Sequence, residues 1–141
     1  MNSNIAIASA VTSYARIHMI SYKTSNTFKC YYTDTDSVMI DSDLDSSLIS
    51  NNLGMMKDEL NGVRIKEAIF LGNKKYCYTF EEGGVLQTRS VFSGAPRNSL
   101  TMEDFKKMLK GEIVPITLKS QFVKTIRNLN VKIKEKVIRL R

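Results

Sequence analysis

Two aspartates separated by one residue are the side chains in this sequence best placed to do chemistry. Residues 27–33 are rich in aromatic and β-forming residues and predict a strand, and residues 37–40 predict a second strand. Asp34 and Asp36 stand between them, so the pattern predicts a β-hairpin with both aspartates at a solvent-exposed tip. Two neighbouring carboxylates repel each other unless a cation neutralises them. Mg²⁺ suits such a tip, because it takes a few carboxylates and completes its shell with water and substrate phosphates.

Phosphoryl transfer is the chemistry that this kind of site serves. One metal ion activates the attacking hydroxyl, and a second stabilises the leaving oxygen. Two carboxylates on one hairpin cannot hold two metal ions, so a further acidic residue must come from elsewhere in the fold. The competing interpretation is structural: Asp34 and Asp36 are turn-forming aspartates that bond to their own backbone. For an isolated Asp-X-Asp pattern, which is short and common, the structural interpretation is the favoured one.

The segment before the hairpin predicts a helix over residues 4–22. Apolar residues recur there at spacings of three and four and define one apolar face: Ile7, Val11, Tyr14, Ala15, His18 and Met19. Ser3 or Asn4 is the expected cap. We expect His18 to pack in an interface of this helix and not to bind a metal. After the hairpin, residues 41–52 predict a loop that leads into a helix around residues 48–60.

The second half of the sequence predicts strands, one helix and more strands. Strands are expected over 63–70, 75–80 and 85–91, with a turn at 81–84 and a break at 94–98. Thr101 predicts the start of a helix that reaches about residue 110, with Asp104 at its third position. The tail, residues 113–141, alternates apolar and basic residues and predicts strands with one basic face. The fold class is therefore α+β.

Composition and charge bound the function. The chain has 141 residues and a formal net charge of +7, which fits one modest domain or part of a larger one and favours a polyanionic partner such as nucleic acid. Cys30 and Cys77 form no CxxC pair, and we expect two buried, reduced thiols. No stretch is apolar enough to span a bilayer, and the first residues lack the features of a secretory or mitochondrial targeting signal.

The hexapeptide Tyr-Thr-Asp-Thr-Asp-Ser at residues 32–37 resembles motif C, YxDTDS, of the family B DNA polymerases. Residues 7–16 resemble the helix that leads from the fingers into the palm of that family. Residues 53–59 and 66–71 resemble the next palm segment of its protein-primed branch, which serves certain phages, adenoviruses and linear organellar plasmids. Residues 74–76, Lys-Lys-Tyr, match the KxY motif, and residues 94–107 resemble the start of a thumb. Read with these flanks, the aspartate pair favours the metal site over the structural turn.

The resemblance implies an architecture and a set of site residues. It implies the C-terminal part of a polymerase palm over residues 1–92 and the start of a thumb-like region over 93–141. Asp36 would be the direct metal ligand, with Asp34 adjacent and supporting, and the metal would be Mg²⁺. Lys74 and Tyr76 would contact the primer strand of a primer–template DNA, and deoxynucleoside triphosphates would be the substrates. From the residues alone, Tyr78 and Phe80 are expected on a half-buried strand face.

The resemblance also implies what has to come from elsewhere. Motif A, which supplies the second essential carboxylate, and motif B, which binds the incoming nucleotide, are expected upstream of this segment, so we expect no activity from this chain alone. A separate chain would carry the rest of the polymerase, and a terminal protein would be the primer. A mitochondrial location, organelle-encoded or on a linear plasmid, is the expected one. Two alternatives stay open: a non-catalytic DNA-binding remnant, and a decayed open reading frame.

Overall fold

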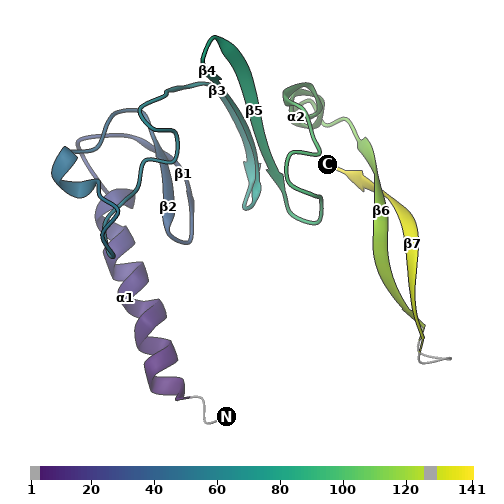
Figure 1. Cartoon of the computed structure of the whole chain (residues 1–141), viewed down its shortest axis with the longest axis horizontal. Coiled ribbons are helices and arrows are strands. Elements are labelled where there is room, and N and C mark those ends of the chain that lie inside the picture. The colour runs from purple at the N-terminus through teal and green to yellow at the C-terminus, as the bar shows by residue number, and fades with distance from the viewer. Residues whose placement is uncertain (1–3, 126–129) are drawn as a thin grey trace. The chain divides into compact units, whose positions relative to one another are not determined.

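The computed structural model describes residues 4–125 and 130–141 (Figure 1). They form two α-helices, a short 3₁₀ turn and seven strands, which agrees with the predicted α+β class. The chain divides into two compact units, Met1–Glu59 and Leu60–Arg141. No helix in the described part of the chain has the length and apolarity needed to cross a membrane.

The first unit begins with helix α1, Ile5–Lys23. Asn4 caps it as predicted, because its side-chain oxygen accepts hydrogen bonds from the backbone N–H groups of Ala6 and Ile7 (3.0 and 3.3 Å). The predicted apolar face is largely exposed, since only Met19 and Tyr22 are buried in this helix. The described residues do not cover His18: its side chain is exposed, and its ring meets the Tyr22 ring edge-on with centroids 5.6 Å apart. Its packing in an interface stays a prediction.

Strands β1 (Cys30–Asp34) and β2 (Ser37–Ile40) follow and pair as the predicted antiparallel hairpin. β1 starts three residues later than predicted. The reason is a local turn, in which Ser25 Oγ and Thr27 Oγ1 lie 2.8 Å apart and the Thr27 N–H donates to Ser25 Oγ (3.2 Å). Such hydroxyl-to-backbone bonds compete with strand pairing, so the chain becomes extended only after them.

The helix predicted around residues 48–60 does not form. A 3₁₀ turn, Ser46–Leu48, follows the cap residue Asp45, and the chain then closes a loop. Ile49 bridges Met56, with backbone bonds from Ser50 to Met56 and from Met56 to Leu48. The apolar residues have helical spacing, but Ser, Asn and a glycine at φ +86° interrupt them and favour turns.

The second unit contains a three-stranded antiparallel meander of β3 (Ile65–Gly72), β4 (Lys75–Glu82) and β5 (Val85–Phe92). Helix α2 (Met102–Leu109) packs on one face of this sheet. Strands β6 (Val114–Thr125) and β7 (Asn130–Leu140) form a long hairpin. All of these elements were predicted, with boundaries displaced by a few residues.

The core of the second unit joins the sheet, the helix and the base of the long hairpin. Its buried members are Cys77, Phe92, Leu100, Met102, Phe105, Met108, Val114 and Leu140. The Phe92 and Phe105 rings meet edge to face at 6.1 Å. The predicted division at residue 92/93 falls within this core, because Phe92 ends β5 and packs on α2. The two compact units meet at residues 59/60. The assignment of palm to residues 1–92 and of thumb to 93–141 stays a prediction.

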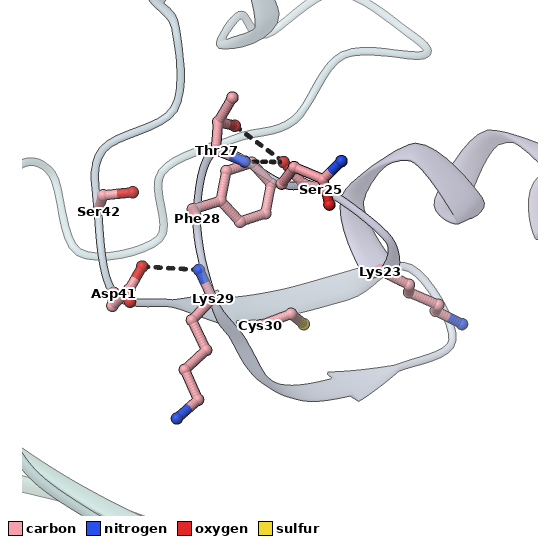
Figure 2. Close-up of a pocket in the computed structure, with 9 residues that line it drawn as sticks. Lys23, Ser25, Thr27, Phe28, Lys29, Cys30, Asp41 and Ser42 are labelled. Atoms are coloured by element: carbon pink, nitrogen blue, oxygen red, sulfur yellow. Dashed lines mark hydrogen bonds between the residues drawn. The ribbon is translucent and has the colours of Figure 1, made fainter.

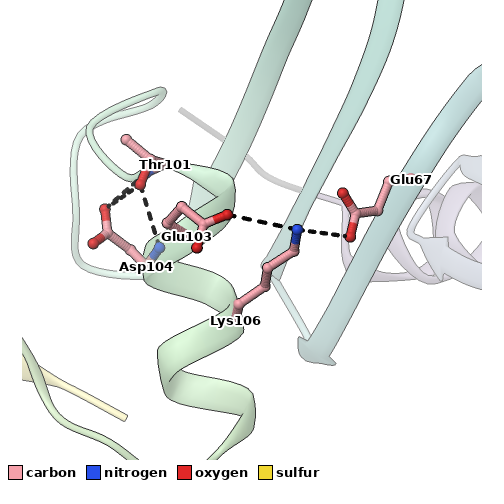
Figure 3. Close-up of polar contacts among 5 residues, drawn as sticks. All are labelled: Glu67, Thr101, Glu103, Asp104 and Lys106. Atoms are coloured by element: carbon pink, nitrogen blue, oxygen red, sulfur yellow. Dashed lines mark hydrogen bonds and ion pairs between the residues drawn. The ribbon is translucent and has the colours of Figure 1, made fainter.

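Helix α2 is fixed at its start by the predicted capping box, shown in Figure 3. The Asp104 N–H donates to Thr101 Oγ1 (3.2 Å), and the Thr101 N–H donates back to the Asp104 carboxylate (2.9 Å). Further along, Lys106 lies between Glu67 of β3 (3.1 Å) and Glu103 (3.6 Å). The hydrogen bond with the Glu67 carboxylate raises the pKa of Lys106. Lys106 therefore ties the exposed side of α2 to the sheet.

The two cysteines are free, as expected. Cys77 is fully buried in the core. Its burial, with smaller contributions from Glu67 and Asp104, raises the pKa of its thiol from 9.0 to about 11. Cys30 differs from the expectation, because it is only half-buried at the start of β1, where its thiol donates to the Tyr32 carbonyl (3.6 Å).

Candidate functional site

The acidic tip is a two-residue turn. Asp34, the last residue of β1, pairs with Ser37, the first residue of β2, so Thr35 and Asp36 alone form the turn. The Ser37 hydroxyl donates to the Asp34 carbonyl across the turn (3.0 Å), and the Thr35 hydroxyl donates to the Asp34 carboxylate (3.2 Å). The hydroxyls of Thr35 and Ser37 therefore shape the turn, and that of Thr35 also hydrogen-bonds one of its two carboxylates.

Thr35 adopts an unusual backbone conformation, with φ at +51°. A β-branched residue rarely occupies this region, because its side chain crowds the backbone, and such strain costs on the order of 1–3 kcal/mol. Strained residues of this kind concentrate at functional sites. The conformation sets the path of the chain between the two aspartates.

Asp34 and Asp36 differ in exposure. Asp34 is half-buried, while Asp36 is exposed at the end of the turn. Within residues 4–125 and 130–141, the Asp36 carboxylate takes part in no hydrogen bond or ion pair. The assignment of Asp36 as the direct metal ligand, with Asp34 in support, stays a prediction. The same described residues contain no group of three or more His, Cys, Asp or Glu side chains arranged to hold a metal ion.

A bulge in β1 lies three residues before the tip, a feature that the sequence analysis missed. Cys30 pairs with Ile40 and Tyr32 pairs with Met39, so Tyr31 is the extra residue. Its ring is exposed, and the Lys29 ammonium lies 5.0 Å from the ring centroid. Bulges bend a strand, increase its twist and re-aim side chains beside active sites. The bulge at Tyr31 therefore bends β1 shortly before the Asp34–Ser37 turn.

The base of the hairpin is fixed by Asp41, as Figure 2 shows. The Lys29 N–H donates to the Asp41 carboxylate (2.9 Å), and the Asp41 N–H donates to the Lys29 carbonyl (3.2 Å). A shallow hollow lined in part by Lys23, Lys29 and Phe28 lies here. The hollow lies at the opposite end of the hairpin from Asp34 and Asp36.

Lys74 and Tyr76 lie in the second compact unit, at the turn between β3 and β4 and at the start of β4. Lys74 is exposed and has a left-handed backbone, with φ at +54°. Tyr76 is half-buried. Lys75, between them, lies over the Phe92 ring (4.9 Å to the centroid) and donates to the Arg141 carbonyl (3.4 Å).

Tyr76 begins a ladder of aromatic rings along one face of β4. Its ring stacks on Tyr78 with centroids 6.3 Å apart and planes 15° apart, and Tyr78 meets Phe80 at 6.0 Å. Arg89 of β5 lies over the Phe80 ring at 5.1 Å. Tyr78 and Phe80 are buried, more completely than the half-buried face that the sequence predicts. The ladder holds the ring of Tyr76 in a defined plane.

The basic tail has lysines along one side of β7, but the predicted single basic face is incomplete. Lys132, Lys134 and Lys136 alternate along β7, so their side chains lie on one side of the hairpin with a repeat of about 6.7 Å. The opposite side exposes apolar residues, among them Phe122 and its cross-strand partner Ile133, but it also carries Lys124 and Arg139. One side of the hairpin therefore carries the three lysines of β7, while the other side is mixed, with apolar and basic side chains.

Comparison with known proteins relates this chain to DNA polymerases. It is similar to a protein of Podospora anserina named "Probable DNA polymerase", with 35% identity over 112 residues that cover 74% of this chain and 9% of that protein. Proteins of the same name from Neurospora intermedia and Ascobolus immersus are 40% identical over 82 residues and 25% identical over 142 residues. These matches cover 58% and 100% of this chain and 7% and 12% of the two proteins.

The chain thus spans about a tenth of the length of these curated relatives. No protein-family model matches the sequence. No solved structure matches the fold.

Proposed function

We propose that this chain carries one metal-binding corner of a family B DNA polymerase of the protein-primed branch, within its palm. The observation that carries the proposal is the acidic turn: Asp36 is exposed at the tip of a strained two-residue turn, with Asp34 beside it. Its agreement with the motif C hexapeptide and the polymerase names of the relatives support the same assignment.

The donor set fits Mg²⁺. Carboxylate oxygens are the protein ligands that this hard cation takes, and an exposed turn leaves room for the waters and phosphates that complete its shell. Asp36 would be the direct ligand. Asp34 would lie beside the metal and support Asp36. It is half-buried, and its carboxylate accepts a hydrogen bond from Thr35. When bound, the metal ions supply charge stabilisation for nucleotidyl transfer from deoxynucleoside triphosphates.

Nucleic-acid contacts are assigned to the second unit. Lys74, exposed in the turn before β4, supplies a mobile charge for a primer phosphate. Tyr76, held by stacking on Tyr78, presents its ring and hydroxyl to the terminal sugar of the primer. The lysine face of β7 adds contacts to the phosphates of the primer–template duplex, which carry no sequence information.

The remaining parts of the reaction belong to other segments of the polymerase. A second essential carboxylate and the nucleotide-binding lysine come from there, so this chain alone incorporates no nucleotides with Mg²⁺ or Mn²⁺. A terminal protein serves as the primer, and the polymerase works in mitochondria or on a linear plasmid. These assignments follow from the family resemblance.

Paramagnetic Mn²⁺ tests the metal site directly in the isolated chain. We expect it to broaden the amide signals of residues 33–38 selectively, because a cation held by Asp36 lies beside these amides. Asp36→Asn removes one negative charge and should abolish the selective broadening. Asp43→Asn removes the same charge at another exposed position of the same unit and should leave it intact. Broadening centred elsewhere, or equal in the Asp36→Asn variant, would refute the metal site.

A DNA-binding module without catalysis is the second candidate, and the lysine face of β7 favours it. The two candidates separate on the same protein. Retention on DNA without selective Mn²⁺ broadening at residues 33–38 supports the binding module. Both properties together support the polymerase segment.

A further inference from the structure

Helix α1 exposes apolar side chains that the rest of its compact unit does not cover. Ile7, Val11, Tyr14 and Ile17 are each more than 60% exposed. At 3.6 residues per turn they lie within about 120° of one another around the axis and form a continuous apolar stripe. The buried residues of the helix, Met19 and Tyr22, lie near its C-terminal end. The stripe therefore begins where packing against the hairpin unit stops.

The helix is poorly equipped to stand alone. Its exposed turns are rich in β-branched residues, which lose side-chain freedom in a helix and are weak helix formers. Most of the stability of a helix in a protein comes from packing an apolar face, which the exposed turns of α1 lack here. The first turn has no acidic residue to favour the helix dipole. The exposed stripe and the low helix propensity of these turns both indicate that another surface covers and stabilises α1.

We infer that the α1 stripe, defined as Ile7, Val11, Tyr14 and Ile17, is a docking surface for a polymerase segment outside the region that this chain matches. The Ascobolus immersus relative carries the argument. Its match covers this whole chain, α1 included, yet takes up only 12% of that protein. The counterpart of α1 therefore sits within a much longer polymerase-named chain. The inference rests on the proposed function, because the segment that covers the stripe would belong to the same polymerase.

The chemistry of the stripe defines the partner surface. The stripe carries no charged side chain, so its complement is an apolar groove. Ser9 and Arg16 lie on the opposite side, where Ile5 and Ile20 are also exposed towards the two ends of the helix. Ser9 lies about 140° from Tyr14 around the axis. A partner that covers the stripe therefore leaves the Ser9 side in water. A charge introduced on the stripe should therefore weaken partner binding, whereas a charge introduced at Ser9 should not.

Mixing the chain with the remainder of a relative tests the inference. The probes are the Podospora anserina and Ascobolus immersus proteins, each with its matched region deleted. We expect a one-to-one complex with at least one of them by light scattering, and slower amide exchange over residues 7–17 on binding. Val11→Asp or Ile17→Asp should weaken the complex roughly tenfold or more, since each buries an unpaired charge. Ser9→Asp, the matched control, should change affinity by less than about threefold.

The outcomes are distinct. No complex with either remainder overturns the inference, and so does a complex that Val11→Asp and Ser9→Asp weaken equally. A homodimer of this chain that Val11→Asp dissociates also overturns it, because a second copy is then the occupant. Selective Mn²⁺ broadening at residues 33–38 is measured in the same samples. If it persists while the complex fails, the docking surface is refuted and the proposed function stands.

Discussion

Replacing Phe105 by alanine should destabilise the whole second unit and not helix α2 alone. Phe105 is fully buried and meets the Phe92 ring at the end of β5 edge to face. The same core includes Cys77 of β4 and Val114 of β6. Removal of the ring therefore leaves a cavity in the core that these elements share, and the cost falls on the packing between them.

The expected cost is about 3–5 kcal/mol, the range for Phe→Ala in a core, which includes the lost edge-to-face contact. Small domains are stable by only about 5–15 kcal/mol. With a urea m-value of about 1 kcal/mol per M for a unit of this size, the midpoint should fall by about 3 M or more. Leu109 lies on the same helix but is 64% exposed, so Leu109→Ala should stay within about 0.5 kcal/mol.

Urea unfolding of the full chain, with amide exchange read separately for β3–β5 and α2, measures this effect. The two regions should lose protection together. A cost below about 1 kcal/mol for Phe105→Ala would contradict the cavity argument. Exchange that rises in α2 while β3–β5 keep full protection would contradict the shared core, and would make residue 92/93 a physical boundary.

Two further predictions concern pH and salt. The folded state holds the Cys77 proton up to about pH 11, whereas the unfolded chain releases it near 9.0. The contribution of Cys77 to stability should therefore be constant below pH 9 and fall by about 2–3 kcal/mol between pH 9 and 11. Urea titrations should show a smaller loss over this range in Cys77→Ala than in the parent protein, and equal pH profiles would contradict this. DNA binding should be weak, with a Kd of about 10⁻⁴–10⁻⁶ M, and insensitive to sequence. Lys134→Gln should make the slope of log K against log salt less negative by about 0.9. Lys110 is another exposed lysine of this unit, and Lys110→Gln should leave the slope unchanged. Equal slopes for the two variants would show that the β7 lysines are only solvated.

Local chemistry made much of the fold predictable from the sequence. The Thr101–Asp104 capping box and the Asn4 cap are short-range bonds, so the residues themselves indicate them. The acidic hairpin was predictable for the same reason, because two strand-forming runs leave only a tight turn between them. The helix expected at 48–60 failed because its apolar spacing was read without the weight of the polar turn-forming residues between.

Features that depend on contacts across the chain were not predictable. The bulge at Tyr31 is a property of the pairing between β1 and β2, which the sequence of one strand does not reveal. Lys75 over Phe92 requires knowledge of the register of β4 and β5. The exposure of the α1 stripe was missed for another reason: apolar periodicity predicts that a face will be covered, and not which part of a protein covers it.

The loop after β5 has a consequence for aggregation. The Ser90 N–H donates to the Asn98 side-chain oxygen, and the Asn98 N–H donates to the Ser90 carbonyl (both 2.9 Å). One asparagine thereby occupies the outward-facing backbone groups that an added strand would use. Unpaired edges of this kind are templates for strand addition between molecules. The other end of β5, where Val85 and Leu86 are more than half exposed, has apolar side chains at the same edge, so self-association through this sheet would start beside the Gly83–Gly84 turn.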